Sequence, residues 1–490
     1  MKNTSSLENW FQKKNHGRSE TQKRTKTCEC PLCGLGIGEK LINAHLDVCL
    51  ERSKKRKTEE EPCNRSSAKS NAAAAAKTET TPNDKSKKKD AFTHMMELES
   101  KKQKFHLSSS SFRTFFSNQS SAADTKEEEI AWSARVQLRQ IDTSNISLQR
   151  RHLLLTTSIS PDHHRNATTT ALVRHHSRLS IPVLKSILQK SIRRRRPLPA
   201  TRVAMELADK AIGELLRRLP IILLEDSTLH PDFSFLVWLM AAHSKGFSIP
   251  RDLLTKVLKI VYEVASCPWQ DELQEINSLQ SSSDTKPSSS SPNNDLPVVC
   301  QAMKIRRSYG GMKCDMVMLE RYERQWAHRY MGHQPCLPED MQERPHAKSW
   351  SNIPAAIHSS TSPTKPQLQL LLENGLEKLE IQDVCLEGID NHCSDVLQKV
   401  TAQLDLPKVK ERMKLDGIIA NDCSHDDDVL SIFKQHMWDY SSGVNHRQPL
   451  FARTKKKEDR DEIAKKFWLD VLDKPVKEFA MSYVNRHLVK

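Results

Sequence analysis

Hydrophobic residues recur at helical spacing through much of the second half of the chain. The positions that share one face of a helix over 200–219 are Val203, Leu207, Ala211, Leu215 and Leu219. The stretches "FSFLVWLMAA" and "IPRDLLTKVLKIVYEVASC" predict two more helices, the second with Pro250 in its first turn. Helical spacing returns at 305–330, 367–404 and 463–484. The hydrophobic pattern therefore predicts a mainly α-helical body.

Polar stretches without periodicity divide the chain into regions. The expected regions are a basic disordered N-terminus at 1–27, a compact Cys/His unit at 28–55, a disordered basic and Ser-rich linker at 56–130, a helical region at 131–276, a linker or insertion at 277–297 and a second helical region at 298–490. We expect the last region to continue the same domain. The run "PIILLED" at 220–226 resembles a SUMO-interacting strand, but it follows an amphipathic helix directly, which favours buried core.

An excess of basic residues indicates which partners to consider. The chain has 76 Lys and Arg against 61 Asp and Glu, a formal net charge of +15. Such a charge indicates an anionic partner such as nucleic acid, or residence in the nucleus, although solvated tails explain it equally well. The clusters "SKKRK", "KSKKKD" and "SIRRRRP" are typical of nuclear-import signals. The last of them, Arg193–Arg196, ends a predicted helix, where positive charge also suits the helix dipole.

Other classes of protein are disfavoured. The longest apolar runs, "LPIILL" and "FSFLVWLMAA", fall short of the roughly 20 residues that a membrane helix needs. Only 13 glycines are present, which disfavours folds built on glycine-rich phosphate loops. The first residues, "MKNTSSLENWFQKKN", lack an apolar signal core. We therefore expect no membrane partner, and a reducing compartment in which clustered cysteines bind metal rather than form disulfides.

One cysteine cluster has the spacing of a metal site. In "CECPLCGLGIGEKLINAHLDVCL", Cys30 and Cys33 form a Cys-x2-Cys knuckle, and His45 and Cys49 follow on a predicted helix. Because these two lie four residues apart, their side chains leave the same helix face and can reach one ion. Three thiolates and one imidazole suit tetrahedral Zn²⁺ without an open position, which is typical of a structural site. The unit is too small to fold on a hydrophobic core alone, so the metal would supply folding energy.

The residues between these ligands resemble a known family. Residues 28–52 resemble the UBZ ubiquitin-binding zinc finger, in the class found in the E3 ligase of post-replication repair. The matching features are the Cys-Pro-x-Cys knuckle, Ile-Asn before the histidine, and the ending His-Leu-Asp-x-Cys-Leu. Gly38 stands where a proline is common in the family, and Cys28, two residues before the first ligand, is interpreted as a bystander. The resemblance predicts a small ββα zinc finger, joined by long disordered segments to the mainly α-helical C-terminal domain.

The resemblance also gives roles to individual residues. Cys30, Cys33, His45 and Cys49 would hold zinc. Ile42, Leu46 and Leu50 would pack over the knuckle. The residues that the resemblance places on the opposite, ubiquitin-binding face are Lys40, Ala44, Asp47 and Val48. Asp47 would face the basic rim of ubiquitin's apolar patch. The alternative for Asp47 is an ordinary solvated carboxylate.

DNA binding is the alternative function for this finger. Fingers that read the major groove place Arg, Gln or Asn near the start of the helix. Here the helix begins Gly-Glu-Lys-Leu-Ile-Asn, and its exposed face carries Asp47 and Glu51, which disfavours contact with phosphates. The basic "ERSKKRK" that follows suits contact with nucleic acid without sequence reading. We therefore favour ubiquitin as the partner of the finger.

Two segments have the spacing of peptides that bind the sliding clamp. In "TSSLENWF" the residues with this spacing are Leu7, Trp10 and Phe11. In "SSSFRTFF" they are Phe112, Phe115 and Phe116. Both segments lack the leading glutamine that is usual in such peptides, and a chance aromatic cluster is the alternative in each case.

Three functions fit these patterns. The first is a nuclear adaptor in the DNA damage response or repair, recruited by the finger to ubiquitinated chromatin or to a ubiquitinated clamp. The second is a nuclease-like DNA-processing enzyme with an active site in the helical body, and the third is a sequence-neutral DNA-binding protein. The sequence has no Walker loop, and "GIDNHCSD" and "IANDCSHDDD" are best interpreted as loops and helix caps. Converging acidic side chains in a pocket of the body would favour the enzyme, and an apolar or basic concavity would favour the adaptor.

Overall fold

The computed structural model describes residues 27–29, 36–38, 103–118, 129–138, 151–161, 172–273, 297–331, 353–359, 365–389, 394–419, 426–450 and 460–488. The chain divides into two compact units, Met1–Lys87 and Lys88–Lys490. In the first unit, β1 (Thr27–Glu29) and β2 (Gly36–Gly38) form an antiparallel pair. The remaining described elements belong to the second unit, which is mainly helical.

A mixed four-stranded sheet begins the second unit. Its strands are β3 (Gln103–Leu107), β4 (Thr114–Asn118), β5 (Trp132–Leu138) and β6 (Arg151–Thr157), in the order β4-β3-β6-β5. The β3–β6 pair is parallel and the two outer pairs are antiparallel. Along β5, Ser133, Arg135 and Gln137 are exposed and alternate with more buried residues. This alternation is the mark of a strand with one face on the core.

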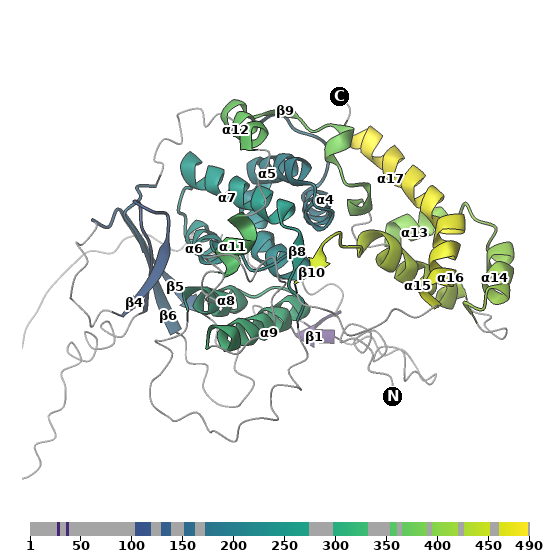
Figure 1. Cartoon of the computed structure of the whole chain (residues 1–490), viewed down its shortest axis with the longest axis horizontal. Helices are drawn as coiled ribbons and strands as arrows, with labels where there is room; N and C mark the ends of the chain where they lie inside the picture. The colour runs from purple at the N-terminus through teal and green to yellow at the C-terminus, as the bar shows by residue number, and fades with distance from the viewer. Residues whose placement is uncertain are drawn as a thin grey trace, which may run out of the picture. The chain divides into compact units, whose positions relative to one another are not determined.

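The sheet is attached to the helical core by specific contacts. The indole of the buried Trp238 donates a hydrogen bond to the carbonyl of Phe105 at 3.0 Å, and the Thr114 hydroxyl donates to Ser234 at 2.7 Å. Trp132, Trp238 and Phe247 pack edge to face, with ring centroids 5.0–6.0 Å apart. Figure 1 shows the sheet beside α6 (Phe233–His243).

These strands correct two expectations from the sequence. The linker expected at 56–130 is wrong for 103–118, and the region expected to be helical at 131–276 begins with β5, β6 and the short β7 (Val173–His175). The physical reason is that β3 and β4 are short and surrounded by Ser and Lys. The strand β3 is stabilised by pairing with β6, about fifty residues further along the chain, and β4 pairs with β3. The long-range pairing leaves little local signal.

The helices of the main core follow the predicted pattern. They are α4 (Ile181–Arg193), α5 (Pro197–Asp226), α6, α7 (Arg251–Ser266), α8 (Val298–Ser308) and α9 (Lys313–Tyr330), joined by the shorter α11 (Ile353–Ser359) and α12 (Lys365–Asn374). Pro250 is the N-cap residue directly before α7, one residue earlier than the first-turn position expected from the sequence. The run at 220–226 lies in α5 with Ile221–Leu224 buried, so the interpretation as core is confirmed. An extended residue, Ala211, interrupts α5.

A second helical group follows with its own hydrophobic cluster. Its elements are α13 (Ser394–Thr401), α14 (Leu406–Leu415), α15 (Asp426–Met437), α16 (Arg460–Phe467) and α17 (Asp473–Leu488), with π-helical segments η5 (Trp438–Ser442) and η6 (Trp468–Leu472). Phe479 of α17 packs against both hydrophobic clusters, and Ala480 and Val484 lie in the main one. The helix α17 therefore joins the two groups.

Short strands and turns complete the connections. In the first pair, β7 is parallel to β9 (Leu376–Lys378), and in the second β8 (Trp269–Gln270) is parallel to β10 (Gln448–Pro449). Between β9 and α13 lie two 3-10 turns, η3 (Ile381–Asp383) and η4 (Leu386–Gly388). A Cβ atom on Gly388 would lie 2.6 Å from the backbone of Ile187. Only glycine therefore permits this approach of η4 to α4.

Replacing Phe116 with alanine is expected to lower the free energy of unfolding by about 2 kcal/mol, because a half-buried ring that stacks on another aromatic ring is lost. Its ring lies parallel to that of the fully buried Phe105 with centroids 4.2 Å apart. The neighbouring Phe115 is 40% exposed, so Phe115→Ala is the control and should cost less than about 1 kcal/mol. Urea denaturation of both variants measures the difference, and equal losses would contradict this packing.

Candidate functional site

The predicted zinc ligands lie outside the described residues, but the hairpin that flanks two of them does not. Cys30, Cys33, His45 and Cys49 are all outside the described ranges, and so are Lys40, Ala44, Asp47 and Val48. The strands β1 and β2 pair Thr27 with Gly38 and Glu29 with Gly36. The segment 30–35, which contains the Cys-x2-Cys knuckle, therefore connects two antiparallel strands.

The two predicted clamp-binding peptides have different outcomes. Leu7, Trp10 and Phe11 lie outside the described residues. Phe112 and Phe116 pack against the main hydrophobic core, while Phe115 is exposed on β4. A docking peptide needs its three side chains free together, so this second segment does not fit that role. The aromatic cluster is instead part of the sheet.

The basic cluster at 193–196 also differs from its expected role. Arg193 is buried and forms an ion pair with the buried Asp226 at 2.5 Å, and it donates a hydrogen bond to the carbonyl of Ser442 at 2.7 Å. Arg194 donates to the carbonyl of Ser441 and lies 3.5 Å from Glu387. These contacts join α4 to the segment that ends η5. The arginines thus hold two helical groups together, which leaves them poorly placed as an import signal.

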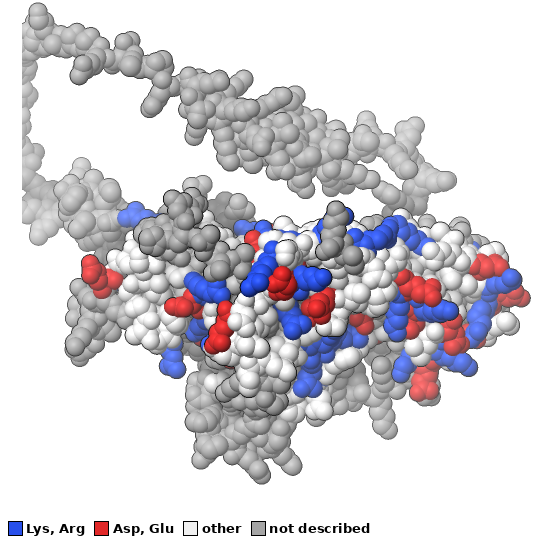
Figure 2. All heavy atoms as spheres, turned by 90° about the horizontal axis from the view of Figure 1, so that it is seen from above, with Lys and Arg blue, Asp and Glu red and all other residues white. Residues whose placement is uncertain are grey.

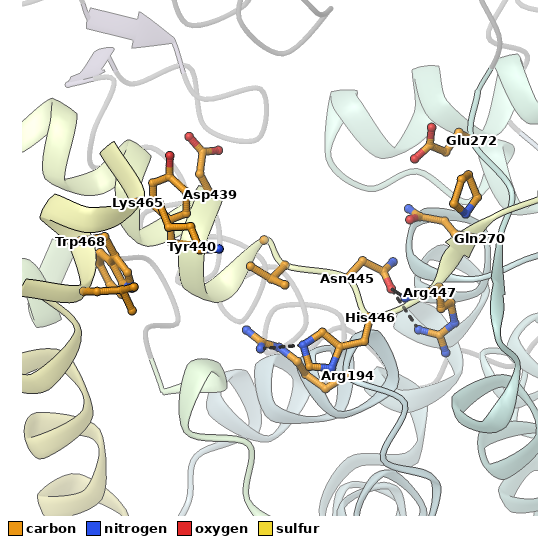
Figure 3. A pocket seen from close by; sticks show the side chains of 14 residues that line it. Arg194, Gln270, Glu272, Asp439, Tyr440, Asn445, His446, Arg447, Lys465 and Trp468 are labelled. Atoms are coloured by element: carbon orange, nitrogen blue, oxygen red, sulfur yellow. Dashed lines mark hydrogen bonds between the residues drawn. The ribbon is translucent and has the colours of Figure 1, made fainter. Parts of the chain in front are cut away.

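Near this joint lies a cleft of about 700 Å³. The end of α4 and the segment 443–447 provide Arg194, His446 and Arg447, and η5 and α16 provide Tyr440 and Lys465. Figure 3 shows Arg194, His446 and Arg447 together at one side of the cleft, with Tyr440 and Lys465 on the facing wall. The volume is that of a site for a small molecule or for part of a larger ligand.

The electrostatic potential at this side of the cleft is positive. Arg447 is buried, and its guanidinium donates to the backbone carbonyls of Ile192 at 2.5 Å and Val264 at 2.6 Å. Burial lowers the pKa of Arg447 to about 10, so the side chain still carries its charge at neutral pH. Partial burial, followed by the charge of Arg194, lowers the pKa of His446.

Acidic side chains do not converge in this cleft. Its two carboxylates, Glu272 and Asp439, stand on opposite walls in Figure 3. Within the residues that the structure describes, no three His, Cys, Asp or Glu side chains are arranged to hold a metal ion. The candidate residues in "GIDNHCSD" and "IANDCSHDDD", which include His392, Cys393, Cys423 and His425, lie largely outside the described ranges. The cleft therefore lacks the converging carboxylates that would favour a nuclease-like enzyme.

A buried polar cluster between α7 and α11 is structural. The rings of His230 and His358 are in contact at a tilt of 51°, with centroids 4.5 Å apart, and His358 lies 3.1 Å from the hydroxyl of Thr228. The other histidine, His230, lies 3.0 Å from the carboxylate of Glu263. Burial holds the pKa of His358 well below its usual value. The tilted ring contact and these hydrogen bonds secure α11 to the core.

Charge on the face shown in Figure 2 is mixed rather than segregated. On the face shown in Figure 2, Lys and Arg side chains alternate with Asp and Glu over the described residues. A sequence-neutral DNA-binding surface is expected to present a basic stripe, and this face does not present one.

His175 and His176 are exposed beside Glu377 and Asp209, as is typical of solvated histidines.

The residues of the cleft could not be found from sequence alone. In the sequence, Arg194 stands out only as part of a basic run, and His446, Arg447 and Lys465 lie in separate segments without a common motif.

Among the helices that the structure describes, none has the length and apolar composition needed to span a bilayer. No family model, curated protein or solved structure matches this chain.

Proposed function

We propose that this chain is a nuclear ubiquitin-binding adaptor in the DNA damage response or repair. A small ββα zinc finger would recruit it to ubiquitinated chromatin or to a ubiquitinated clamp. The observation that carries this proposal is the sequence from Cys30 to Leu50. It has four proposed zinc ligands at the spacing of a structural site, and the residues between them resemble those of a ubiquitin-binding finger.

The donor set suits a closed zinc site. Cys30, Cys33 and Cys49 would bind as thiolates and His45 as a neutral imidazole, so the ion keeps no open position and serves to hold the fold. The antiparallel β1–β2 pair supports this arrangement, because it flanks the knuckle in the way that a ββα finger requires. The ion would fix the helix that follows relative to this hairpin.

The helix face opposite the zinc ligands is the proposed ubiquitin contact. Lys40, Ala44, Asp47 and Val48 recur at spacings of three and four residues, which places them on one face of a helix. The small Ala44 at the centre permits close approach of a flat apolar patch, and Asp47 would meet that patch's basic rim. These roles follow from the resemblance of residues 28–52 to the UBZ family.

Additional contacts would raise the affinity of a single weak finger. Linking a second module converts its binding into an intramolecular event and increases avidity through effective concentration. The segment 4–11, with Leu7, Trp10 and Phe11, is the candidate for a second contact with the sliding clamp. The finger and the segment 4–11 would then recruit the mainly helical second unit.

Replacing Asp47 with alanine is expected to weaken ubiquitin binding by the zinc-loaded full chain about tenfold, because a charge that faces a basic rim is lost. The matched control is Glu39→Ala, which removes the same charge about one quarter of a helical turn away from this face. Calorimetric titration with ubiquitin measures both affinities. Absence of binding by the unmodified chain, or equal losses in the two variants, would contradict the proposal.

A further inference from the structure

We propose that the cleft beside α4, η5 and α16 binds the phosphate of a nucleotide, either free or at the end of a nucleic acid strand. This proposal is independent of the zinc finger, because every lining residue belongs to the second unit. The phosphate would lie at the side formed by Arg194, His446 and Arg447. The base would lie toward Tyr440 on the facing wall.

The cationic side of the cleft carries more positive charge than its own carboxylates balance. Arg194, Arg195 and Arg447 all act to lower the pKa of His446, and Glu387 opposes them. Among the described residues, no carboxylate forms an ion pair with Arg447; its guanidinium is held by backbone carbonyls. The charge of Asp226 acts on Arg447 in the favourable direction, but that carboxylate is already paired with Arg193. A buried arginine without a directly paired anion is costly. An anion in the cleft would lower this cost.

The side chains available there suit phosphate in particular. The Nη1 of Arg194 lies 3.3 Å from the Nε2 of His446, so one anion can accept hydrogen bonds from both residues once the imidazole is protonated. Lys465 is exposed at the end of α16 and lines the same cleft. The flexible ammonium of a lysine serves as a point charge for phosphate oxygens. A cationic ligand would be repelled by the same groups.

The opposite wall is built from unusual backbone. The two π-helical segments, η5 and η6, begin at Trp438 and Trp468, and both contribute residues to the cleft. Single π-helical turns within α-helices occur frequently at functional sites. A Cβ atom on Gly443 would lie 2.5 Å from the carbonyl of Trp438, so glycine is needed for the turn that follows η5. This geometry places the half-buried ring of Tyr440 in the wall, where it can stack on a base.

The carboxylates of the cleft are compatible with this ligand. Asp439 accepts hydrogen bonds from the amide of Gln435 at 3.0 Å, on the outer side of α15 and η5. In Figure 3, Asp439 and Glu272 lie on the two opposite walls, and both are away from Arg194 and His446. A phosphate bound between the basic residues would therefore not be forced against either carboxylate. The volume of about 700 Å³ accommodates one nucleotide.

The test is equilibrium binding of thymidine 5′-monophosphate, 5′-phosphorylated oligothymidylate and unphosphorylated thymidine to the full chain. We expect at least one of the two phosphorylated probes to bind and thymidine not to bind. Tighter binding of the monophosphate identifies a free nucleotide as the ligand, and tighter binding of the oligothymidylate identifies the end of a strand. Lys465→Glu should weaken binding of that probe about tenfold, since an attractive charge becomes repulsive. The matched control Lys466→Glu makes the same change on the adjacent exposed residue, which does not line the cleft, and should leave binding unchanged.

A second readout reports on the phosphate position itself. A bound phosphate is expected to raise the pKa of His446, and proton NMR of the imidazole, assigned with a His446→Gln variant, measures this shift. Equal binding of thymidine and its monophosphate would overturn the proposal. It would also be overturned if neither phosphorylated probe bound, if Lys465→Glu and Lys466→Glu behaved alike, or if the pKa of His446 stayed constant on saturation.

Discussion

Replacing Cys33 with serine is expected to remove zinc from the full chain and to reduce ubiquitin binding below detection. A structural zinc ion contributes about 10–16 kcal/mol to the folding of a small finger, and the loss of one thiolate leaves three ligands for a tetrahedral ion. The helical unit Lys88–Lys490 has its own hydrophobic clusters, so its helical circular dichroism should be unchanged. Metal analysis of the purified variant and a ubiquitin titration measure both effects.

The matched control for this variant is Cys28→Ser. Cys28 lies in β1, two residues before Cys30, and pairs with Ile37 across the hairpin. The same atom is changed in the same part of the chain, but zinc content and ubiquitin binding should stay at the level of the unmodified protein. If Cys28→Ser loses zinc while Cys33→Ser retains it, the assigned ligand set is wrong.

The second large effect is expected from Asp226→Asn, which should lower the free energy of unfolding by about 3–5 kcal/mol because it removes the closer and more buried of the two carboxylates that pair with the buried Arg193. The other carboxylate, Glu225, lies 3.6 Å away and is partly exposed. The Asp226 carboxylate accepts hydrogen bonds from Arg193 at 2.6 Å and from Gln189 at 2.8 Å. Both members of the Arg193–Asp226 pair are at most 3% exposed, so solvent screens the interaction little. Chemical denaturation measures the loss.

Glu214→Gln is the control for this change. It makes the equivalent carboxylate-to-amide substitution in the Lys185–Glu214 pair, which joins α4 and α5 at 2.7 Å but is partly exposed. A surface pair of this kind contributes about 0–1 kcal/mol. Arg193 also donates a hydrogen bond to the carbonyl of Ser442 at the end of η5. Because Asp226 positions Arg193, Asp226→Asn should increase amide hydrogen exchange at the end of η5, whereas Glu214→Gln should not. Similar stability losses in the two variants would show that the joint is not held by this ion pair.

The helices of the fold could be predicted because each one is defined by residues that are close together in the sequence. The spacing of hydrophobic residues at 200–219 and Pro250 before α7 define elements without reference to the rest of the chain. Other features of the same helices were not predicted. The break in α5 falls at Ala211 itself rather than at Gly213, two residues later. The split between α8 and α9 does carry a local signal, because it falls at Gly310 and Gly311, whose positive φ values end the first helix, but the hydrophobic spacing at 305–330 alone does not show it.

The sheet shows where sequence interpretation failed. The stretch "WSARVQL" alternates apolar and polar residues with the period of a strand, so β5 carried a signal that a helical interpretation of 131–276 overlooked. The strands β3 and β4 are different, since only a few apolar residues mark them in a Ser-rich and Lys-rich region. Phe105 and Phe116 come together through strand pairing, and such non-local pairing is not visible in a single segment.

The cleft was unpredictable for a similar reason. Arg194 and His446 lie about 250 residues apart in the chain. They meet because the hydrogen bond from Arg193 to the carbonyl of Ser442 and the packing of α17 bring the two helical groups together. The zinc ligands are the opposite case. Their spacing is local, so the chemistry of the proposed finger can be stated from residues 30–49 even though those ligands lie outside the described ranges.

The most direct test of the proposed function is a titration of isotope-labelled ubiquitin with the unlabelled, zinc-loaded full chain, followed by NMR. We expect chemical-shift changes confined to ubiquitin's apolar patch and its basic rim, and we expect a zinc chelator to reverse them. A ubiquitin spectrum that stays unchanged with fully zinc-loaded protein would contradict the assignment of residues 28–52 as a ubiquitin-binding finger. Shift changes that persist after zinc removal would contradict it as well.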